Sequence, residues 1–133
     1  MKDLLFLYGT LLPGETPAEA EDLVNDLRRV GSASIRGRLY DLGDYPGAIF
    51  DPASATWIHG EIFEVPDDDT LQAIDRYEEF DESDPETSTF VRAKLPARLR
   101  DGRDVESWVY VYNRDPGDAP LVAGGIYSKT RAA

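Results

Sequence analysis

The segment LLFLYGTL at residues 4–11 constrains the fold of this chain more than any other stretch. Its apolar residues run directly into Gly9, a pattern typical of a buried strand that ends in a tight turn. Because glycine has no Cβ, the backbone at this turn can adopt a positive φ and come close to a ligand. Consecutive N–H groups at Gly9, Thr10 and Leu11 would then form a small concave site for a carboxylate or a developing oxyanion. A first core strand followed by an ordinary loop is the alternative interpretation.

The composition is that of one folded domain without cysteine chemistry. At 133 residues the chain is long enough for one hydrophobic core, so we expect a single domain over residues 1–133. The 41% share of apolar residues favours a folded protein over a disordered one. The absence of cysteine excludes disulfides, thiolate metal sites and a cysteine nucleophile.

Charge and hydropathy limit the partners and the location of the protein. The net charge of −12 argues against nucleic acid and against anionic membrane surfaces, because both repel an acidic domain. No apolar stretch approaches the roughly 18 residues that a membrane-spanning helix needs. The N-terminal apolar run is too short for a secretory signal, and Asp3 stands where such a signal has positive charge. We therefore expect a cytoplasmic protein.

Two segments are expected to be helical. The first begins with Thr16 as N-cap and Pro17 in the first helical position, and it ends at Gly31. Its apolar residues recur at helical spacing: Ala20, Leu23, Val24, Leu27 and Val30. The second helix runs from Asp67 to about Glu79 and has three aspartates at its positive N-terminal end.

The other regular segments are typical of strands, within residues 33–65 and over 90–99 and 105–112. Gly37 and Gly60 interrupt two of them, which indicates strongly coiled strands of the kind that a small barrel requires. Asp101-Gly102 predicts a hairpin between the last two strands. The expected fold class is α+β: a small mixed or antiparallel β-barrel of about six strands flanked by two helices.

One carboxylate of the second helix falls on the wrong face. Leu71, Ile74 and Tyr77 define the apolar stripe, and Glu78 lies inside it, whereas Glu79 points to the opposite side. A carboxylate in an apolar environment is costly when ionised, so the pKa of Glu78 should rise toward neutrality, as general-base chemistry requires. A frayed last turn that lets Glu78 reach solvent is the alternative.

Taken together, these segments resemble the gamma-glutamylcyclotransferase family, in particular its AIG2-like and gamma-glutamylamine cyclotransferase-like branch. The matching pieces cover nearly the whole chain: residues 5–11, 37–42, 45–47, 60–63, 71–78, 90–92 and 108–112. The most specific pair joins Tyr-Gly-Thr-Leu near the N-terminus to the Asp-x-x-Glu that ends at Glu78. Three residues depart from the family pattern: Glu79 replaces a common glycine, Phe90 a common tyrosine, and Tyr127 a common tryptophan.

The resemblance implies a barrel with a pocket, in which the turn of Tyr8, Gly9, Thr10 and Leu11 binds a γ-glutamyl moiety and Glu78 acts as acid/base. The implied enzyme is a cyclotransferase that converts a γ-glutamyl amine or γ-glutamyl amino acid into 5-oxoproline and the free amine. Such a reaction needs neither a metal ion nor an organic cofactor. A non-catalytic small-molecule binding domain and a hydrolase of the same γ-amide are the alternatives. The sequence indicates neither the leaving amine nor the oligomeric state.

Other candidate residues have simpler interpretations. His59 is the only histidine, and no serine or other partner for a catalytic triad is evident in the sequence. The acidic run from Glu78 to Glu86 lacks the ligand spacing of an EF-hand loop, so no metal site is expected there. Arg36 and Arg92 could pair with a substrate carboxylate, although surface salt bridges explain them equally well.

Overall fold

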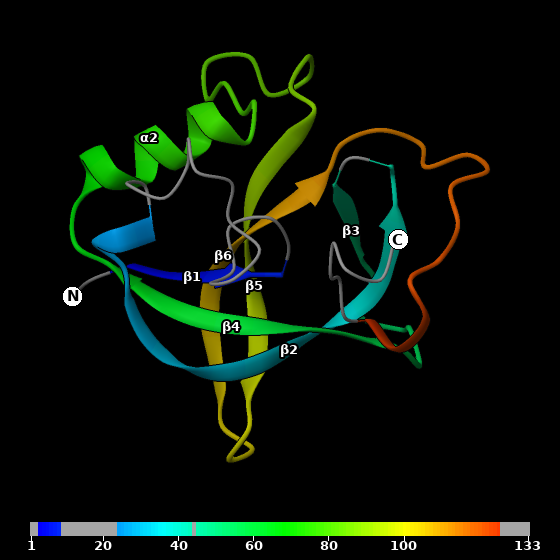
Figure 1. Cartoon of the computed structure of the whole chain (residues 1–133), viewed down its shortest axis with the longest axis horizontal. Coiled ribbons are helices and arrows are strands. Elements are labelled where there is room, and N and C mark those ends of the chain that lie inside the picture. Colours follow the sequence, from blue (N-terminus) through cyan, green and yellow to red (C-terminus); the bar gives the residue numbers. More distant parts are fainter. Residues whose placement is uncertain (1–2, 9–23, 44, 126–133) are drawn as a thin grey trace.

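The computed structural model describes residues 3–8, 24–43 and 45–125, and Figure 1 shows their arrangement. The elements in chain order are β1 (Asp3–Leu7), β2 (Arg28–Asp41), β3 (Pro46–Phe50), β4 (Trp57–Val65), α2 (Asp68–Tyr77), β5 (Phe90–Leu99), β6 (Asp104–Tyr112) and the short 3-10 helix η2 (Ala123–Gly125). This confirms the predicted α+β class. The helix expected from Thr16 falls mostly outside the described residues.

Five of the strands close into a barrel. The sheet order is β3-β2-β4-β1-β6-β5, and β5 also pairs with β2, where Ala33 lies opposite Leu99. Every pairing is antiparallel except that of β1 with β6, so the barrel is mixed. β3 pairs only with the second half of β2 and extends the sheet outside the closed ring.

The first strand is apolar on both faces because it lies between two cores. Successive side chains of a strand point to opposite faces. Phe6 therefore enters the barrel interior, whereas Leu5 and Leu7 face the core beneath α2. Leu71 and Ile74 of α2 complete this second core, and both are buried. Their burial contributes about 2 kcal/mol each and covers one side of the barrel with the helix.

The predicted end of the first helix is wrong. Residues 28–30 were expected in its last turn, but they form the start of β2, where Arg28 pairs with Glu64 of β4. Val30, expected on the apolar stripe, is 44% exposed and sits at an irregularity in the β2–β4 register. Because these residues pair with β4, tertiary context overrides the helical spacing.

Gly60 and Gly37 lie where neighbouring strands come very close, as the prediction of strongly coiled strands required. A Cβ on Gly60 would be 2.2 Å from the carbonyl oxygen of Leu7, and one on Gly37 would be 2.2 Å from that of Ile49. No real side chain fits at these distances. Gly60 therefore allows β4 to approach β1 within the closed ring, and Gly37 allows β2 to approach β3 beside it.

Candidate functional site

The helix α2 carries Glu78 at its C-terminal end. Asp67 caps the start of the helix, since its Oδ1 accepts a hydrogen bond from the Thr70 backbone N–H at 2.8 Å. At the other end, the Phe80 N–H bonds to the carbonyl of Asp75 at 2.8 Å, and the Glu79 N–H bonds to that of Arg76. This is a Schellman motif, which requires its C′ residue to adopt the left-handed conformation. Glu79 does so, with φ of 58°.

The Glu78 carboxyl lies in a desolvated environment. Burial raises its pKa to about 7, and the neighbouring Glu79 charge contributes a smaller increase. Glu79 itself is exposed, in agreement with the helical phase. The helix end is closed by its own hydrogen bonds, so the frayed turn considered as an alternative does not describe this segment. At neutral pH, Glu78 can therefore both accept and return a proton.

Tyr8, which directly follows β1, interacts electrostatically with this carboxyl. Its side chain is buried, and its hydroxyl donates to the backbone carbonyl of Tyr110 and accepts from the Ala48 N–H at 3.3 Å. Burial raises the pKa of Tyr8 far above its usual value, and the charge of Glu78 raises it further. Tyr8 thus stays a neutral phenol. Gly9, Thr10 and Leu11, the rest of the predicted turn, lie outside the described residues.

Three side chains form a buried cluster beside Glu78. Their contact was not predicted from the sequence. Asp75 accepts hydrogen bonds from Arg92, to Oδ1 from Nε at 2.8 Å and to Oδ2 from Nη2 at 3.2 Å. Its Oδ1 also accepts the Tyr110 hydroxyl. The side chains of Arg92 and Asp75 are only 8% and 7% exposed. We call Asp75, Arg92 and Tyr110 the Asp75 cluster.

The structure shows what binds Arg92 and Arg36, the two arginines considered as ligands of a substrate carboxylate. Arg92 is bound to Asp75 inside the protein, so it forms neither a surface salt bridge nor a free anion site. Arg36 donates to the Ser54 carbonyl at 2.9 Å and stacks on Trp57. The sequence feature that could have indicated this buried cluster is Asp75, which lies four residues after Leu71 and therefore near the apolar stripe of the helix.

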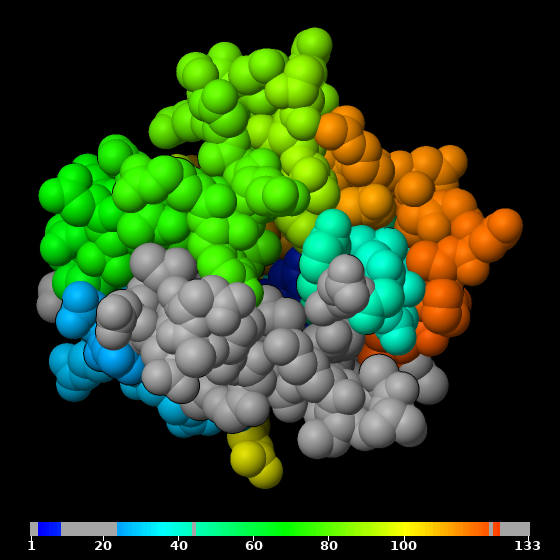
Figure 2. Space-filling view, turned by 45° about the horizontal axis from the view of Figure 1, so that its top comes forward, coloured from blue at the N-terminus to red at the C-terminus, as the bar shows by residue number. Residues whose placement is uncertain are grey.

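The surface is hollowed next to these residues. Figure 2 shows dark-blue atoms of the first strand at the bottom of a depression, between green atoms at the end of α2 and teal atoms of β3. Pro46, Gly47 and Ala48 of β3 are buried, and Tyr45 packs edge-on against Phe90 at 5.6 Å between ring centroids. The depression thus lies between the region of α2 and the apolar strand β3.

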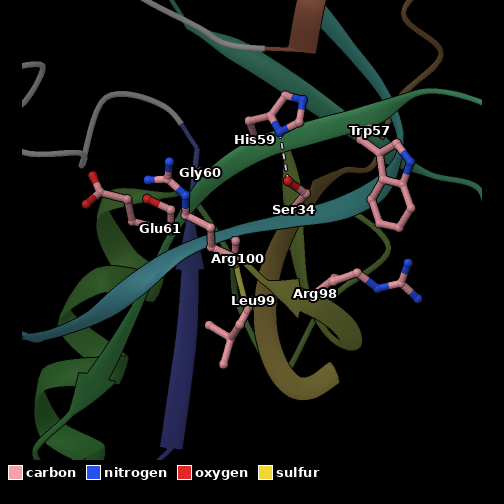
Figure 3. A pocket seen from close by; sticks show the side chains of 10 residues that line it. Ser34, Trp57, His59, Gly60, Glu61, Arg98, Leu99 and Arg100 are labelled. Carbon is pink, nitrogen blue, oxygen red and sulfur yellow. Dashed lines mark hydrogen bonds between the residues drawn. The ribbon is translucent and has the colours of Figure 1, made fainter. Parts of the chain in front are cut away.

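A second hollow lies on the outer face of β2, β4 and β5, where a groove of about 870 Å³ is lined by Trp57, His59, Arg98 and Arg100 (Figure 3). Neither Glu78 nor Tyr8 contributes to it. Contrary to the sequence interpretation, His59 has a serine partner: its Nδ1 is 2.7 Å from the Ser34 hydroxyl. Within the described part of the chain no carboxylate bonds to this exposed imidazole, so the pair does not form a triad.

None of the helices within the described ranges is long and apolar enough to cross a membrane.

Comparison with known proteins identifies the family. The model of the family described as gamma-glutamyl cyclotransferase, AIG2-like, matches residues 5–129. No curated protein matches the chain. Among solved structures, an AIG2-like protein from Mus musculus has 21% sequence identity and a TM-score of 0.74, with 96% of this chain and 88% of that one covered.

Two bacterial structures show the same fold. The protein ytfP from Escherichia coli is 24% identical with a TM-score of 0.65, and the match covers 96% of this chain and 98% of that one. YkqA from Bacillus subtilis is 20% identical with a TM-score of 0.72 over 96% of this chain, which spans 40% of YkqA. Because the family model covers most of its length, the chain belongs to the gamma-glutamyl cyclotransferase, AIG2-like family.

Proposed function

We propose that this protein is a cyclotransferase that converts a γ-glutamyl amine or γ-glutamyl amino acid into 5-oxoproline and the free amine, with Glu78 as general acid/base. One observation carries the proposal: the Glu78 carboxyl is desolvated at the end of α2, which raises its pKa to about 7, and its charge acts on the buried phenol of Tyr8. A group that is partly ionised near neutrality can take a proton in one step and return it in the next. Membership of the family supports the choice of substrate class.

The reaction requires only proton transfers and one acyl transfer. The Glu78 carboxylate takes a proton from the α-ammonium of the substrate, and the freed amine attacks the γ-carbonyl carbon. A C–N bond forms and closes a five-membered ring, giving a tetrahedral oxyanion. When the oxyanion collapses, the C–N bond to the leaving amine breaks, and the protonated Glu78 supplies the proton that this amine needs. The ring nitrogen still carries the second proton of the attacking amine, and it passes this proton through the Glu78 carboxylate to the released amine, which leaves as an ammonium ion.

The proposal assigns binding of the γ-glutamyl moiety to Tyr8, Gly9, Thr10 and Leu11. Backbone N–H groups of this turn would stabilise the oxyanion, an effect of about 3 kcal/mol per donor in enzymes where it was measured. The nucleophile is already tethered to the carbonyl it attacks. The protein therefore contributes mainly by holding the folded rotamer of the substrate, since well-oriented intramolecular attack accounts for up to about 7–11 kcal/mol.

The decisive experiment is to incubate the protein with a panel of γ-glutamyl amines and γ-glutamyl amino acids and to identify the product. Release of 5-oxoproline supports the cyclotransferase. Release of glutamate would show a hydrolase, and a melting temperature raised by ligand without turnover would show a binding domain. The Glu78→Gln variant should stay folded and lose turnover by about 10²-fold or more, because general-base assistance contributes about that factor.

The pH dependence provides an independent prediction. Catalysis needs Glu78 ionised, and its pKa is about 7. We therefore expect kcat/KM to rise with pH and to level off above an apparent pKa near 7, measured under conditions where the substrate's own ionisation is known from a titration. An acid limb near the ordinary glutamate value of 4.5 would contradict the assignment.

A further inference from the structure

The apolar contacts of α2 do not by themselves fix the direction in which its last turn points. Leu71 and Ile74 hold the helix against the core beneath it, and Tyr77 and Phe80, which flank Glu78, also pack against that core. Hydrophobic contacts are non-directional, so they permit small rotations and shifts of the helix. Hydrogen bonds and ion pairs have fixed geometry. The Asp75 cluster provides such directional contacts one residue after Ile74 and one turn before Glu78.

The Asp75 cluster joins α2 to two neighbouring strands at one point. Arg92 of β5 and Tyr110 of β6 lie opposite each other in the strand register, and both donate to the carboxylate of Asp75. The guanidinium of Arg92 is itself held over the Trp108 ring, 4.3 Å from its centroid. A planar guanidinium that is stacked and bound through two nitrogens leaves the carboxylate little freedom.

The same cluster reaches the opposite side of the candidate site. The Tyr110 hydroxyl binds Asp75, while the Tyr110 backbone carbonyl accepts the hydroxyl of Tyr8. Tyr8 in turn accepts the N–H of Ala48 in β3. Tyr110 therefore links the helix that carries Glu78 to Tyr8, the residue that follows β1, through two hydrogen bonds.

We infer that Asp75, Arg92 and Tyr110 are positioning residues that hold the Glu78 carboxylate opposite Tyr8. A buried ion pair contributes little net stability, because desolvation of both charges offsets their attraction. Its two-nitrogen geometry instead gives a defined distance between helix and sheet. The inference rests on the proposed function of Glu78, but the position of the carboxyl can be measured without any turnover.

The test uses a variant in which the whole ion pair is replaced by apolar groups, Asp75→Leu combined with Arg92→Met. Glu78 interacts electrostatically with Glu79, with Tyr8 after β1 and with Tyr110 of β6, and Tyr110 in turn interacts with the Arg92–Asp75 pair. Removing both members of the pair leaves the net charge of these surroundings unchanged. A shift in the titration of Glu78 then reports a change in its position.

We expect NMR titration of ¹³C-labelled glutamate carboxyls to show the pKa of Glu78 falling by about one unit or more in the double variant, because the carboxyl gains water. With an active substrate, kcat should fall by about 10²-fold with little change in KM, since small misplacements of a reacting group cost about that much. The matched control is Arg98→Met with Asp104→Leu, a cross-strand pair on the same two strands that is about half exposed. This control variant should change neither the pKa of Glu78 nor kcat.

A second variant covers the case in which the double variant does not fold. Tyr110→Phe removes one hydroxyl and keeps the ring, and it should lower the pKa of Glu78 and kcat in the same direction by a smaller factor. A parent-like Glu78 pKa and parent-like kcat in a folded double variant, or in Tyr110→Phe if that is the variant that folds, would overturn the inference. A parent protein that releases no 5-oxoproline would overturn the proposed function only, because the NMR titration still tests the positioning.

Discussion

Glu78 and Glu79 are chemically identical side chains that the end of α2 places in different surroundings. Glu78 is half-buried with a pKa raised to about 7, whereas Glu79 is exposed and adopts a positive φ of 58°. The left-handed conformation costs a residue with a Cβ about 1–2 kcal/mol relative to glycine. The charge of Glu79 also raises the pKa of Glu78. The departure from the common glycine at this position therefore has both a steric and an electrostatic effect.

Two substitutions of Glu79 separate these effects. Glu79→Gly should stabilise the protein by about 1 kcal/mol, measured by urea unfolding, because it relieves the left-handed strain. It should also move the acid limb of kcat/KM to lower pH, because a negative charge beside Glu78 is lost. Glu79→Gln should shift the acid limb in the same way without the gain in stability. Equal stability of the glycine and glutamine variants would show that the strain is absent.

The raised pKa of Glu78 also makes a prediction for stability against pH. Below about pH 4.5 the carboxyl is protonated in both the folded and the unfolded protein, so the fold loses nothing. Between about pH 4.5 and 7 the unfolded carboxyl ionises while the folded one stays protonated, so the fold loses about 3 kcal/mol over this range and nothing further above it. Glu78→Gln should therefore melt like the parent at pH 4 and at a higher temperature at pH 8.5.

The control for this prediction is Glu106→Gln, which removes an exposed carboxylate of β6. Its difference in melting temperature from the parent should be the same at both pH values. A pH-independent difference for Glu78→Gln as well would mean that its carboxyl is solvated in the folded protein.

Helical spacing alone places Glu78 and Glu79 on different faces of the helix, because it depends only on ten neighbouring residues of sequence. The Asp75 cluster could not be found in the same way. Asp75 binds Arg92 and Tyr110, which are 17 and 35 residues away, and their meeting depends on how β5 and β6 pass beneath the helix. A sequence shows that a charge is near an apolar stripe, but not which distant charge meets it.

Among the elements, those with both a strong period and clear end signals were predicted well. α2 begins at Asp68, one residue after the expected start at Asp67, and β5 and β6 are joined at the predicted Asp101-Gly102 hairpin. The start of β2 was not predicted, because Arg28 and its neighbours obtain their conformation from pairing with β4. The spacing of apolar residues carries no information about a strand partner more than thirty residues away.

The curvature of β4 depends on Gly60, and this dependence can be measured. Gly60→Ala would place a methyl group 2.2 Å from the Leu7 carbonyl oxygen. Since backbone must move to relieve the contact, we expect a loss of about 3 kcal/mol in the free energy of unfolding. Gly31→Ala is the matched control, because nothing lies within 4 Å of the added Cβ. Equal stability of the two variants would show that β1 and β4 can separate without cost.

The molecule as a whole carries 26 acidic residues against 14 lysines and arginines. Self-repulsion of this charge destabilises the compact state. Raising NaCl from 10 to 150 mM, which shortens the screening length from about 30 to about 8 Å, should therefore raise the melting temperature at pH 8. The same change at pH 4.5, close to the sequence pI of about 4.4, should have little effect. A melting temperature that falls with salt at pH 8 would indicate that attractive ion pairs dominate.

The parallel pairing of β1 with β6 also governs how the protein can be assembled. Leu5 lies opposite Trp108, so β1 obtains this neighbour only after β6, about a hundred residues later in the sequence, has been synthesised. Until then, one edge of an apolar strand is open to other chains. β1 is thus synthesised well before the strand that closes the barrel beside it, and the nascent chain is most prone to aggregation during this interval.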